Sequence, residues 1–510
     1  MGSQGPSLLA RYDDFRGGEW GRLDGDSAAA NQWTGTNCLV SKSGAIYKRP
    51  GFTNLGESSW GDYVPKALGW NPATSKIWTI TSDSGVVEVY QCNNPSGGAA
   101  AYSGVNPVVP TSGQRFDWVD DGDIYTYVTS FGNETYRFKH DTAFVKQLGG
   151  AGVSPGGRAI TIFGARLVVG GTTLNPNRIW YSKPYDYDSG TSWPADNFID
   201  IGRSGDTIAG LDTIRDTMIV TMADGDIYTV TGTLGTNEYV RRFTPLGYTG
   251  ANITANTIAT TQRGLMWRLR RRPTASGTYD STHDQHHPQS FDGASLRDID
   301  TLTNWYTETG DAGVVFAAEM LDDAVFAMGN GDFLLLRDGV WTKHQFTVTT
   351  VGDVYGSRVG RNLGFAFERT SDRGKWIALN LGLLDDPTND QDEGAFTAQF
   401  STSWRRAKNG EMVTPRHVLV ELDAFKAPDA RTVAVTLNYH GIYEGTSGDR
   451  TSATQTRTIT EPADPSQRYA LRYSFEPAHP CQAFSVTCTI DGVRVDAISV
   501  YGQTDPVRLP

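Results

Sequence analysis

Short stretches with a strong preference for β-structure, separated by turn-forming residues, are the feature that most limits what this 510-residue chain can fold into. From about residue 61 to residue 384, runs rich in Val, Ile, Thr and aromatic residues follow one another without a helical period. The 57 Gly, 13 Trp, 22 Tyr and 21 Phe suit many short strands joined by tight turns. We therefore expect an all-β protein. The clearest predicted strands are Lys76–Thr81, Ile124–Val128, Arg166–Gly170, Met218–Thr221, Val325–Met328 and Asn362–Phe367.

The hexapeptide Asp-Gly-Asp-Ile-Tyr-Thr occurs twice, at residues 121–126 and 224–229, and a weaker copy begins at Asn330. Gly allows the positive φ of a tight turn and Ile-Tyr-Thr favours extended backbone, so each copy should lead from a turn into a strand. The copies lie about one hundred residues apart, twice the length of a four-stranded blade. This spacing predicts a β-propeller of about six or seven blades over residues 61–384, whose early and late strands close the ring. A calcium loop is the alternative, although its closing Glu is missing.

The C-terminal part shows a cleaner alternation. Residues 384–394 are acidic, rich in turn-forming residues and nearly free of apolar ones, which predicts a linker on the surface. Beyond this linker, every second residue is apolar from 433 to 439 and again from 469 to 475. Residues 395–510 are therefore predicted to form a β-sandwich. Residues 1–60 are irregular and polar, and we expect them to be an extended arm rather than a domain.

A tight hairpin is expected near the end of the chain. Alternating apolar residues run from Phe484 to Ile490, stop at Asp491-Gly492, and resume from Val493 to Ala497. In a hairpin with a two-residue turn, Ile490 opposes Val493, and both apolar sets then lie on one side. The turn residues and the alternation therefore predict the same register.

Charge and composition exclude several classes of protein. The formal net charge of −12 argues against a general duplex-binding protein, because phosphate binding needs concentrated Lys and Arg. No secretion signal opens the chain, and its longest apolar runs are far too short to span a membrane. A phosphate-binding loop, a dinucleotide fingerprint and a nucleophile elbow are all absent, so we expect no enzyme and no cofactor. The cysteines lack the spacing of a zinc site or disulfide framework and are predicted to be buried free thiols; they are Cys38, Cys92, Cys481 and Cys488.

Two clusters of basic or metal-binding residues stand out. His283, His286 and His287 could bind a transition metal, but no convincing fourth ligand follows, and a solvated His-rich loop is the simpler interpretation. The run from Trp267 to Pro273 contains Arg270, Arg271 and Arg272 and could contact DNA phosphates. Pairing of these arginines with acids across a subunit interface is the alternative that we favour.

A third pattern resembles a structural turn of glycan-cleaving propellers. Residues 186–193, Asp-Tyr-Asp-Ser-Gly-Thr-Ser-Trp, approach the Asp-box Ser-x-Asp-x-Gly-x-Thr-Trp of sialidases. Proteins with true Asp-boxes repeat the motif in several blades, and the motif itself does not catalyse. Glycosidase chemistry needs two placed carboxylates or a tyrosine nucleophile, and no pair of acids distinguishes itself in the sequence.

Several segments carry a family resemblance by their order and spacing. Gly17–Asp24, Asn37–Val40 and Gly44–Gly51 resemble the N-terminal signature of the tail nozzle, or tail tubular protein B, family of short-tailed bacteriophages. Residues 160–235 are moderately similar to a blade pair of the same family. The segments that carry this second match are Asn177–Pro184 through Trp193, Asn197–Asp200, Ile208–Leu211 and Asp224–Gly232.

The resemblance implies a structural protein of the virion tail. It implies a homo-hexamer beneath the head-tail adaptor protein, near tail fibre or tailspike proteins, with β-domains around a channel for the viral DNA. An acidic lumen would repel DNA phosphates over about 8 Å at physiological salt, so that the DNA slides without being held. If the N-terminal arm mediates assembly, deleting it should leave folded monomers. The residues that the signature marks for assembly are Arg22, Asp24, Asn37, Arg49, Pro50 and Gly51.

The runner-up hypothesis belongs to another functional class. A propeller that binds or degrades cell-surface carbohydrate, as a minor tail protein, would use aromatic residues as stacking platforms and Asp188 as part of an Asp-box. A glycan-binding or depolymerase assay separates the two hypotheses, because a structural conduit cleaves no glycan.

Overall fold

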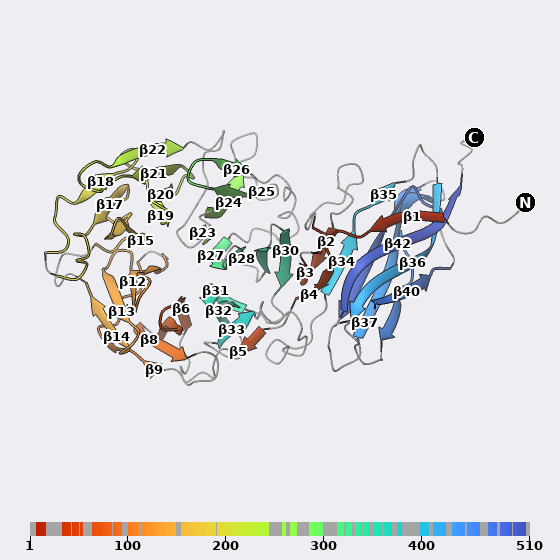
Figure 1. Cartoon of the computed structure of the whole chain (residues 1–510), viewed down its shortest axis with the longest axis horizontal. Helices are drawn as coiled ribbons and strands as arrows, with labels where there is room; N and C mark the ends of the chain where they lie inside the picture. Colours follow the sequence, from red (N-terminus) through yellow and green to blue (C-terminus); the bar gives the residue numbers. More distant parts are fainter. Residues whose placement is uncertain are drawn as a thin grey trace, which may run out of the picture. The chain divides into compact units, whose positions relative to one another are not determined.

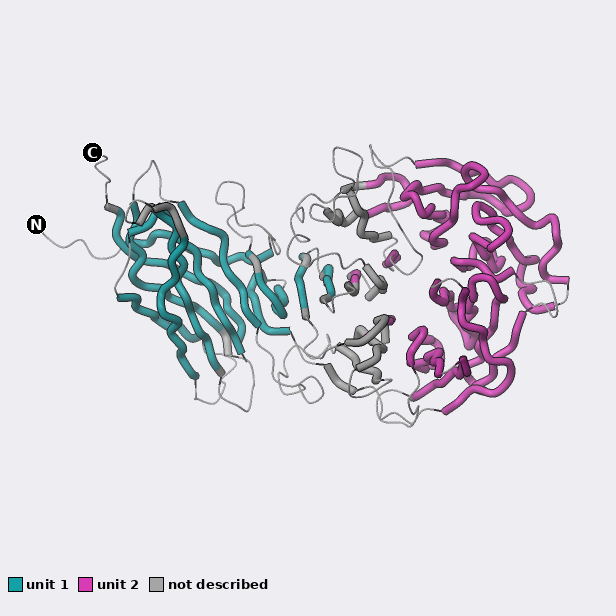
Figure 2. The backbone as a smooth tube through the Cα atoms, turned by 180° about the vertical axis from the view of Figure 1, so that it is seen from behind, with its two compact units in different colours: residues 1–52, 332–347, 380–510 teal, residues 53–331, 348–379 magenta. Residues whose placement is uncertain are grey.

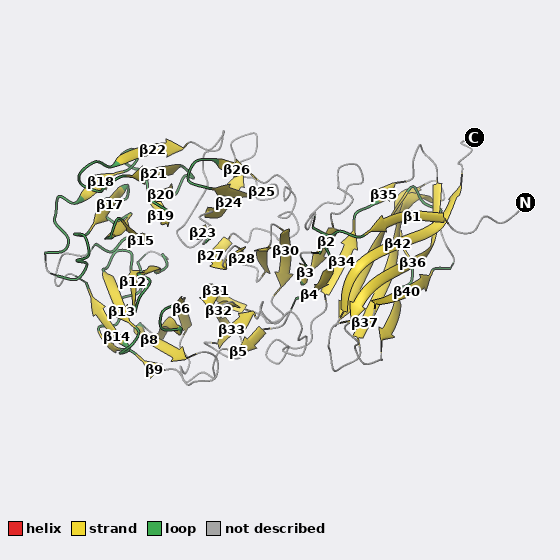
Figure 3. Ribbon diagram, viewed as in Figure 1, coloured by secondary structure: helices red, strands yellow, loops and turns green. Residues whose placement is uncertain are grey.

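The chain forms two compact units in which every regular element of the described residues is a β-strand (Figures 1 and 3). Unit 1 contains residues 1–52, 332–347 and 380–510, and unit 2 contains residues 53–331 and 348–379 (Figure 2). No helix that could cross a membrane occurs in the described part of the chain. The computed structural model describes residues 7–16, 33–41, 43–49, 52–54, 64–83, 85–93, 100–111, 114–148, 155–189, 191–243, 258–261, 266–272, 285–298, 314–320, 323–328, 332–337, 340–345, 350–359, 362–369, 375–379, 398–406, 412–424, 431–443, 446–459, 468–476, 480–491 and 493–505.

Unit 2 is a succession of small sheets, built from strands that follow one another in the sequence. The first four contain β6 (Val64–Asn71), β7 (Lys76–Asp83), β8 (Val86–Asn93) and β9 (Ala100–Ala101); β10 (Ser103–Gly104), β11 (Asp117–Asp120), β12 (Tyr125–Thr129), β13 (Thr135–Lys139) and β14 (Phe144–Gln147); β15 (Ala159–Phe163), β16 (Arg166–Gly170), β17 (Arg178–Tyr181) and β18 (Phe198–Asp200); β19 (Ile208–Ile214), β20 (Thr217–Met222), β21 (Ile227–Thr231) and β22 (Tyr239–Phe243). All pairs are antiparallel except the parallel contact of β10 with β14.

Three further sheets follow in the strand order. They contain β23 (Ile258–Thr260), β24 (Met266–Arg272), β25 (Gln285–Phe291) and β26 (Leu296–Asp298); β27 (Val314–Met320), β28 (Asp323–Met328), β29 (Asp332–Arg337) and β30 (Val340–Gln345); β31 (Thr350–Val359), β32 (Asn362–Arg369), β33 (Lys375–Leu379) and β5 (Phe52–Asn54). The early strand β5 completes the last sheet, as the predicted closure by early and late strands requires.

The first strands of these sheets connect the series into a closed order (Figure 1). β11 contacts β15, and contacts continue from β15 to β19, β23, β27, β31 and back to β6. The first two sheets also share a core, in which Trp78 packs edge-to-face against Phe138 with ring centroids 5.2 Å apart. The described strands thus form a series of small antiparallel sheets, which confirms the all-β prediction, while the propeller of about six or seven blades stays a prediction.

The repeated hexapeptide forms turns, but its two copies occupy different places in their sheets. Asp121 accepts a hydrogen bond from the Asp123 backbone N–H at 2.9 Å, and Asp224 accepts one from Asp226 at 3.0 Å, so both copies make the same local turn. The first copy leads into β12, which pairs directly with β11, the strand that contacts the next sheet. The second copy leads into β21, which β20 separates from the corresponding strand β19. The interpretation of the equal spacing as equivalent repeat positions is therefore wrong for the first copy. The same turn chemistry serves any tight connection between antiparallel strands.

Gly69 on β6 allows two elements of the first sheet to approach closely. It lies opposite the fully buried Trp78 of β7, and a Cβ at position 69 would lie 2.1 Å from the indole ring. Trp78 cannot move aside, because Trp118 and Phe138 pack edge-to-face against it. The side chain of any larger residue must therefore displace a packed core.

We expect Gly69→Ala to lower the free energy of unfolding by about 3 kcal/mol, the upper range for overpacking a core. Gly85→Ala is the control, because no atom lies within 4 Å of a Cβ there and only its φ of +88° is unfavourable. This control should cost about 1 kcal/mol. Urea unfolding of both variants measures the difference. Equal midpoints would show that Gly69 is not needed for packing.

Unit 1 is a sandwich of two antiparallel sheets around one core. The first sheet has the order β3-β4-β42-β36-β40 with β1 on β42; the second has the order β2-β34-β41-β37-β38 with β35 on β41 and β39 on β37. The alternating apolar residues predicted from 433 to 439 are fully buried in this core. The strands are β1 (Ser7–Tyr12), β2 (Trp33–Thr36), β3 (Cys38–Val40), β4 (Ile46–Lys48), β34 (Ala398–Thr402), β35 (Arg405–Arg406), β36 (Met412–Ala424), β37 (Arg431–Tyr443), β38 (Thr446–Thr451), β39 (Gln455–Ile459), β40 (Arg468–Ser474), β41 (Ala483–Asp491) and β42 (Val493–Asp505).

The predicted hairpin at Asp491-Gly492 is wrong. β41 pairs with β34 and β37 in one sheet, whereas β42 pairs with β36, β1 and β4 in the other, so the chain crosses between sheets here. Ile490 and Val493 are both buried in the shared core, but they face it from opposite sides. The alternation of apolar residues indicates only which face of a strand is buried. Two facing sheets both bury their inner faces, so the alternation does not show whether two strands belong to the same sheet.

The expected division into an arm and a separate sandwich also needs correction. β1, β3 and β4 belong to one sheet of the sandwich and β2 belongs to the other, with Trp33 opposite Thr402. Tyr12 and Trp33 lie in the core, although they are too widely spaced in the sequence to show a period. The described N-terminal residues are therefore integral strands of unit 1. The four cysteines are buried and unbridged, as predicted.

Candidate functional site

Two residues of the N-terminal signature meet in a buried cluster of unit 1. The backbone of Asn37 has φ +61°, its N–H donates to the Lys343 carbonyl at 3.0 Å, and its carbonyl accepts from Arg49 N–H at 2.9 Å. The Arg49 Nε donates to Asn37 Oδ1 at 3.1 Å. Both residues are buried, with 5% and 1% of their surface exposed. The last two of the three signature segments are thus bonded to each other, and Asn37 is bonded to strand β30.

Aromatic groups surround the Arg49 side chain. Its guanidinium lies 5.9 Å from the ring centre of Phe333 on β29, and that ring stacks on His344 of β30 at 4.9 Å. The ring of His344 is also hydrogen-bonded to Thr342, 2.7 Å away. Burial, with the charge of Arg49, holds the pKa of His344 well below its ordinary value. The cluster therefore carries one fixed positive charge and an uncharged histidine.

Substitution of Asn37 tests whether this cluster stabilises unit 1. Asn37→Gly keeps the left-handed backbone but removes the acceptor of Arg49, so we expect a loss of about 2 kcal/mol in the free energy of unfolding. Asn37→Ala also strains the backbone and should cost about 1 kcal/mol more. Urea unfolding followed by Trp fluorescence measures both. Equal values for the two variants would contradict the backbone part of this account.

The structure does not describe the other four signature residues. Arg22, Asp24, Pro50 and Gly51 lie outside the described residues, as does His283. For Asn37 and Arg49 the structure gives contacts within the chain, and their assignment to assembly stays a prediction.

The basic run and the histidine cluster meet in one pair of strands. Arg270, Arg271 and Arg272 lie on β24, and His286 and His287 lie on β25 rather than in a loop. Arg270 pairs in register with His287, and Arg271 pairs with His286. The interpretation of these two histidines as a solvated loop is therefore wrong. Their separation in sequence concealed that a hairpin would bring them opposite the arginines.

The Asp-box-like segment is a closed turn. Asp186 accepts hydrogen bonds from the hydroxyl groups of Ser189 and Ser192, both at 2.7 Å, which lower its pKa to about 2. Asp188 forms ion pairs with Arg137 at 2.8 Å and Lys146 at 2.9 Å. Its carboxylate is thus neutralised by two cations of the neighbouring sheet. No group of three or more metal-binding side chains occurs among the described residues.

Carboxyl groups on or beside the first strands form a second notable set, which the sequence did not reveal. Asp117 on β11 accepts a hydrogen bond from the Ile160 N–H of β15 at 2.9 Å, and burial raises its pKa to about 8. Burial likewise raises the pKa of Asp212 to about 7 and that of Asp120 to about 7. These residues keep partial solvent exposure although strands enclose their carboxyl groups. They join adjacent sheets, since Asp117 binds β15, Asp212 binds Thr260 and Asp120 binds Asn71.

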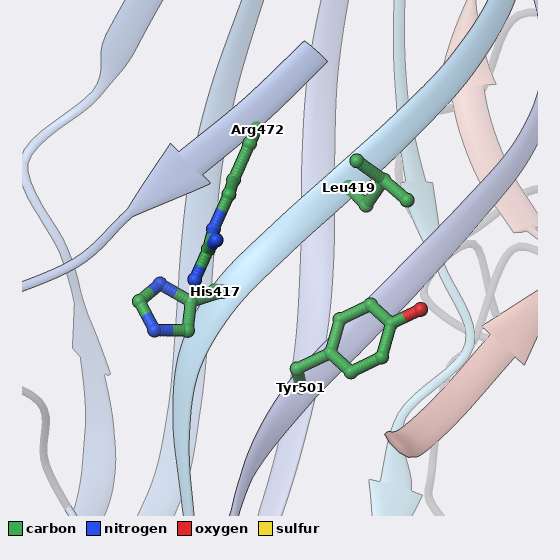
Figure 4. Close-up of a pocket in the computed structure, with 4 residues that line it drawn as sticks. All are labelled: His417, Leu419, Arg472 and Tyr501. Atoms are coloured by element: carbon green, nitrogen blue, oxygen red, sulfur yellow. The ribbon is translucent and has the colours of Figure 1, made fainter. Parts of the chain in front are cut away.

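A hollow of about 280 Å³ lies on the outer face of the first sandwich sheet. Its described lining residues are His417 and Leu419 of β36, Arg472 of β40 and Tyr501 of β42 (Figure 4). Arg472 lies between the alternating apolar residues of 469 to 475. The residues that line the hollow with it come from strands far away in the sequence, and no sequence pattern links these strands. Burial and the charges of Arg472 and Arg416 lower the pKa of His417, although Glu476 opposes them.

Comparison with known proteins gives little similarity. No protein-family model and no curated protein matches this chain. Among solved structures, the crystal structure of Chaetomium thermophilum Raptor is similar with a TM-score of 0.42 and 9% sequence identity, over 68% of this chain and 29% of that chain. This chain thus spans less than a third of the length of Raptor, and a likeness of this level supports no argument about function.

Proposed function

We propose that this protein is a structural subunit of the tail nozzle of a short-tailed bacteriophage, a hexameric conduit for viral DNA beneath the head-tail adaptor. The observation that carries the proposal is the bond between two segments of the N-terminal signature, at Asn37 and Arg49. Residues that carry a resemblance by spacing alone need not touch. Asn37 and Arg49 do touch, in one buried cluster, and this supports the resemblance.

Two further features support a conduit rather than a catalyst. The acidic residues with raised pKa values join neighbouring sheets, and Asp188 is held by two cations, so neither set is arranged to attack a substrate. The net charge of −12 suits a surface past which DNA moves without being held. The basic positions of β24 and β25, which include Arg270, Arg271 and Arg272, would be the exception, as a local contact with DNA or with a neighbouring subunit.

The oligomeric mass and the partner test the proposal. Light scattering of the purified chain should give six times 55.6 kDa, either alone or on mixing with the adaptor protein of the same phage. In physiological salt, the assembly should not shift duplex DNA in a gel. A monomer that ignores the adaptor but binds or cleaves a bacterial polysaccharide would refute the conduit and favour the carbohydrate hypothesis.

A further inference from the structure

The outer face of the sheet with β1, β42, β36 and β40 presents side chains in straight rows across the strands. One row contains Ser474, His417, Tyr501 and Leu8, each paired in register with the next. The strands are about 4.8 Å apart, so such a row is roughly 14 Å long. This is the width that a short extended peptide can cover.

Arg472 forms no ion pair with a carboxylate of the described residues on this face. Among the described residues it has no ion pair or hydrogen bond, and Figure 4 shows its guanidinium beside the imidazole of His417. Glu421 on the adjacent strand β36 is held by Arg11, with Nη1 to Oε1 2.6 Å and Nη2 to Oε2 3.3 Å. The carboxylate of Glu421 is therefore satisfied by a different arginine. No described residue is bonded to Arg472, so its guanidinium has donors for an incoming acceptor.

Apolar surface accompanies this charge. Leu8 is 53% exposed and lies opposite Tyr501, and Leu419 lines the hollow between Tyr501 and Arg472 (Figure 4). Arg and Tyr are the residue types enriched where proteins bind one another, because they combine a large contact area with directed hydrogen bonds. The patch formed by Arg472, His417, Tyr501, Leu419 and Leu8 combines both properties.

We propose that this patch binds an acidic peptide segment of a partner protein, with a carboxylate on Arg472 and an apolar side chain on Tyr501 and Leu8. Charge complementarity favours an acid, since near His417 the two positive charges of Arg472 and Arg416 outnumber the single negative charge of Glu476. The spacing selects an extended peptide, because four residues span about 13 Å. The proposal concerns the sandwich alone and does not depend on the proposed function in the tail.

A synthetic peptide of stated sequence tests the site on the full chain. The probe is fluorescein-labelled Gly-Ser-Glu-Ser-Gly-Ser-Phe-Ser-Gly, in which the acid and the ring are four residues apart, titrated by fluorescence polarisation at low salt. We expect saturable binding that weakens about tenfold in Arg472→Gln, the loss expected for one charge-assisted hydrogen-bonding partner. Tyr501→Ser should weaken it by a similar factor, and replacement of the peptide Glu by Gln should do the same.

The control is Arg457→Gln, which removes an exposed arginine from β39 of the other sheet and should leave binding unchanged. Thermal unfolding of each variant confirms that the sandwich remains folded. Absence of saturable binding to the wild-type chain, or equal binding by Arg472→Gln, would overturn the proposal. A glucuronic acid oligomer is titrated in parallel, and tighter binding of this sugar acid than of the peptide would also overturn it, in favour of an acidic glycan.

Discussion

Removal of residues 1–51 is expected to unfold the sandwich of unit 1 rather than to release a folded monomer. This segment supplies four strands and buries Tyr12, Phe15, Trp33 and Ile46 in the core, among others. Each large apolar side chain buried contributes about 2 kcal/mol, so the loss is on the order of 10 kcal/mol and similar to the whole stability of a domain. Deletion of an exposed arm would instead leave a folded monomer.

Limited proteolysis with mass spectrometry measures this outcome. The shortened chain should be cleaved between residues 398 and 505, while fragments of unit 2 remain protected. A milder variant, Trp33→Ala, removes an indole that donates to the Phe15 carbonyl at 2.9 Å and packs on Phe400. It should lower the free energy of unfolding by about 4 kcal/mol. Protection of the C-terminal strands in the shortened chain would show that the N-terminal strands are dispensable.

Raising the pH from 6.5 to 8.5 is expected to destabilise unit 2 by about 3 kcal/mol. Asp117, Asp120 and Asp212 have pKa values raised to about 8, about 7 and about 7, because burial disfavours their charged forms. In this window the folded state holds protons that the unfolded chain has lost. The free energy of unfolding must therefore fall as the pH rises, and the contribution is fully present only below the pKa of an unfolded Asp, near pH 4.

Other groups with shifted pKa values contribute less to stability in this window. Burial lowers the pKa of His140 to about 4 and lowers that of His344, so both make stability rise with pH, but only up to about pH 6.5. Asp186, with a pKa of about 2, contributes stability that is lost only below about pH 4. The histidine effect fades above about pH 6.5. Burial also raises the pKa of Cys92, which adds a small decrease in stability near pH 8.5. Most of the slope of unit 2 in this window therefore belongs to the three buried carboxyl groups.

Asp117→Asn supplies the matched variant for this measurement. The amide keeps an oxygen that can accept from the Ile160 N–H and never ionises. Urea unfolding at both pH values should show about half of the wild-type decrease in this variant. Asp216→Asn is the control, because Asp216 is exposed in the turn between β19 and β20; its slope should match the wild type. A wild-type stability that rises with pH would contradict the account.

Most single strands could be predicted from the sequence, because turn residues and β-branched runs act locally. The run predicted from Arg166 to Gly170 is β16 with the same bounds, and the alternation from 433 to 439 identifies a buried face of β37. The strand with which each of them pairs was less predictable than the strand itself. Asp491-Gly492 has the chemistry of a hairpin turn, yet the strands on either side pair across different sheets. Local preference determines a strand, whereas long-range packing determines its neighbour.

Sites made from distant strands could not be inferred in the same way. Arg472, His417 and Tyr501 are adjacent only because β36 pairs with both β40 and β42. The bond between Asn37 and Arg49 could partly be anticipated from the sequence, since both residues belong to one spaced signature. The contact of Asn37 with β30, three hundred residues later, could not be anticipated, because no periodicity links the two segments.

Negative-stain imaging of the assembled protein, viewed end-on, tests the central claim that this chain surrounds a passage. The account predicts class averages of a six-fold ring with an open centre. Single particles with the dimensions of one chain, or rings closed at their centre, obtained with the adaptor protein present, would contradict it.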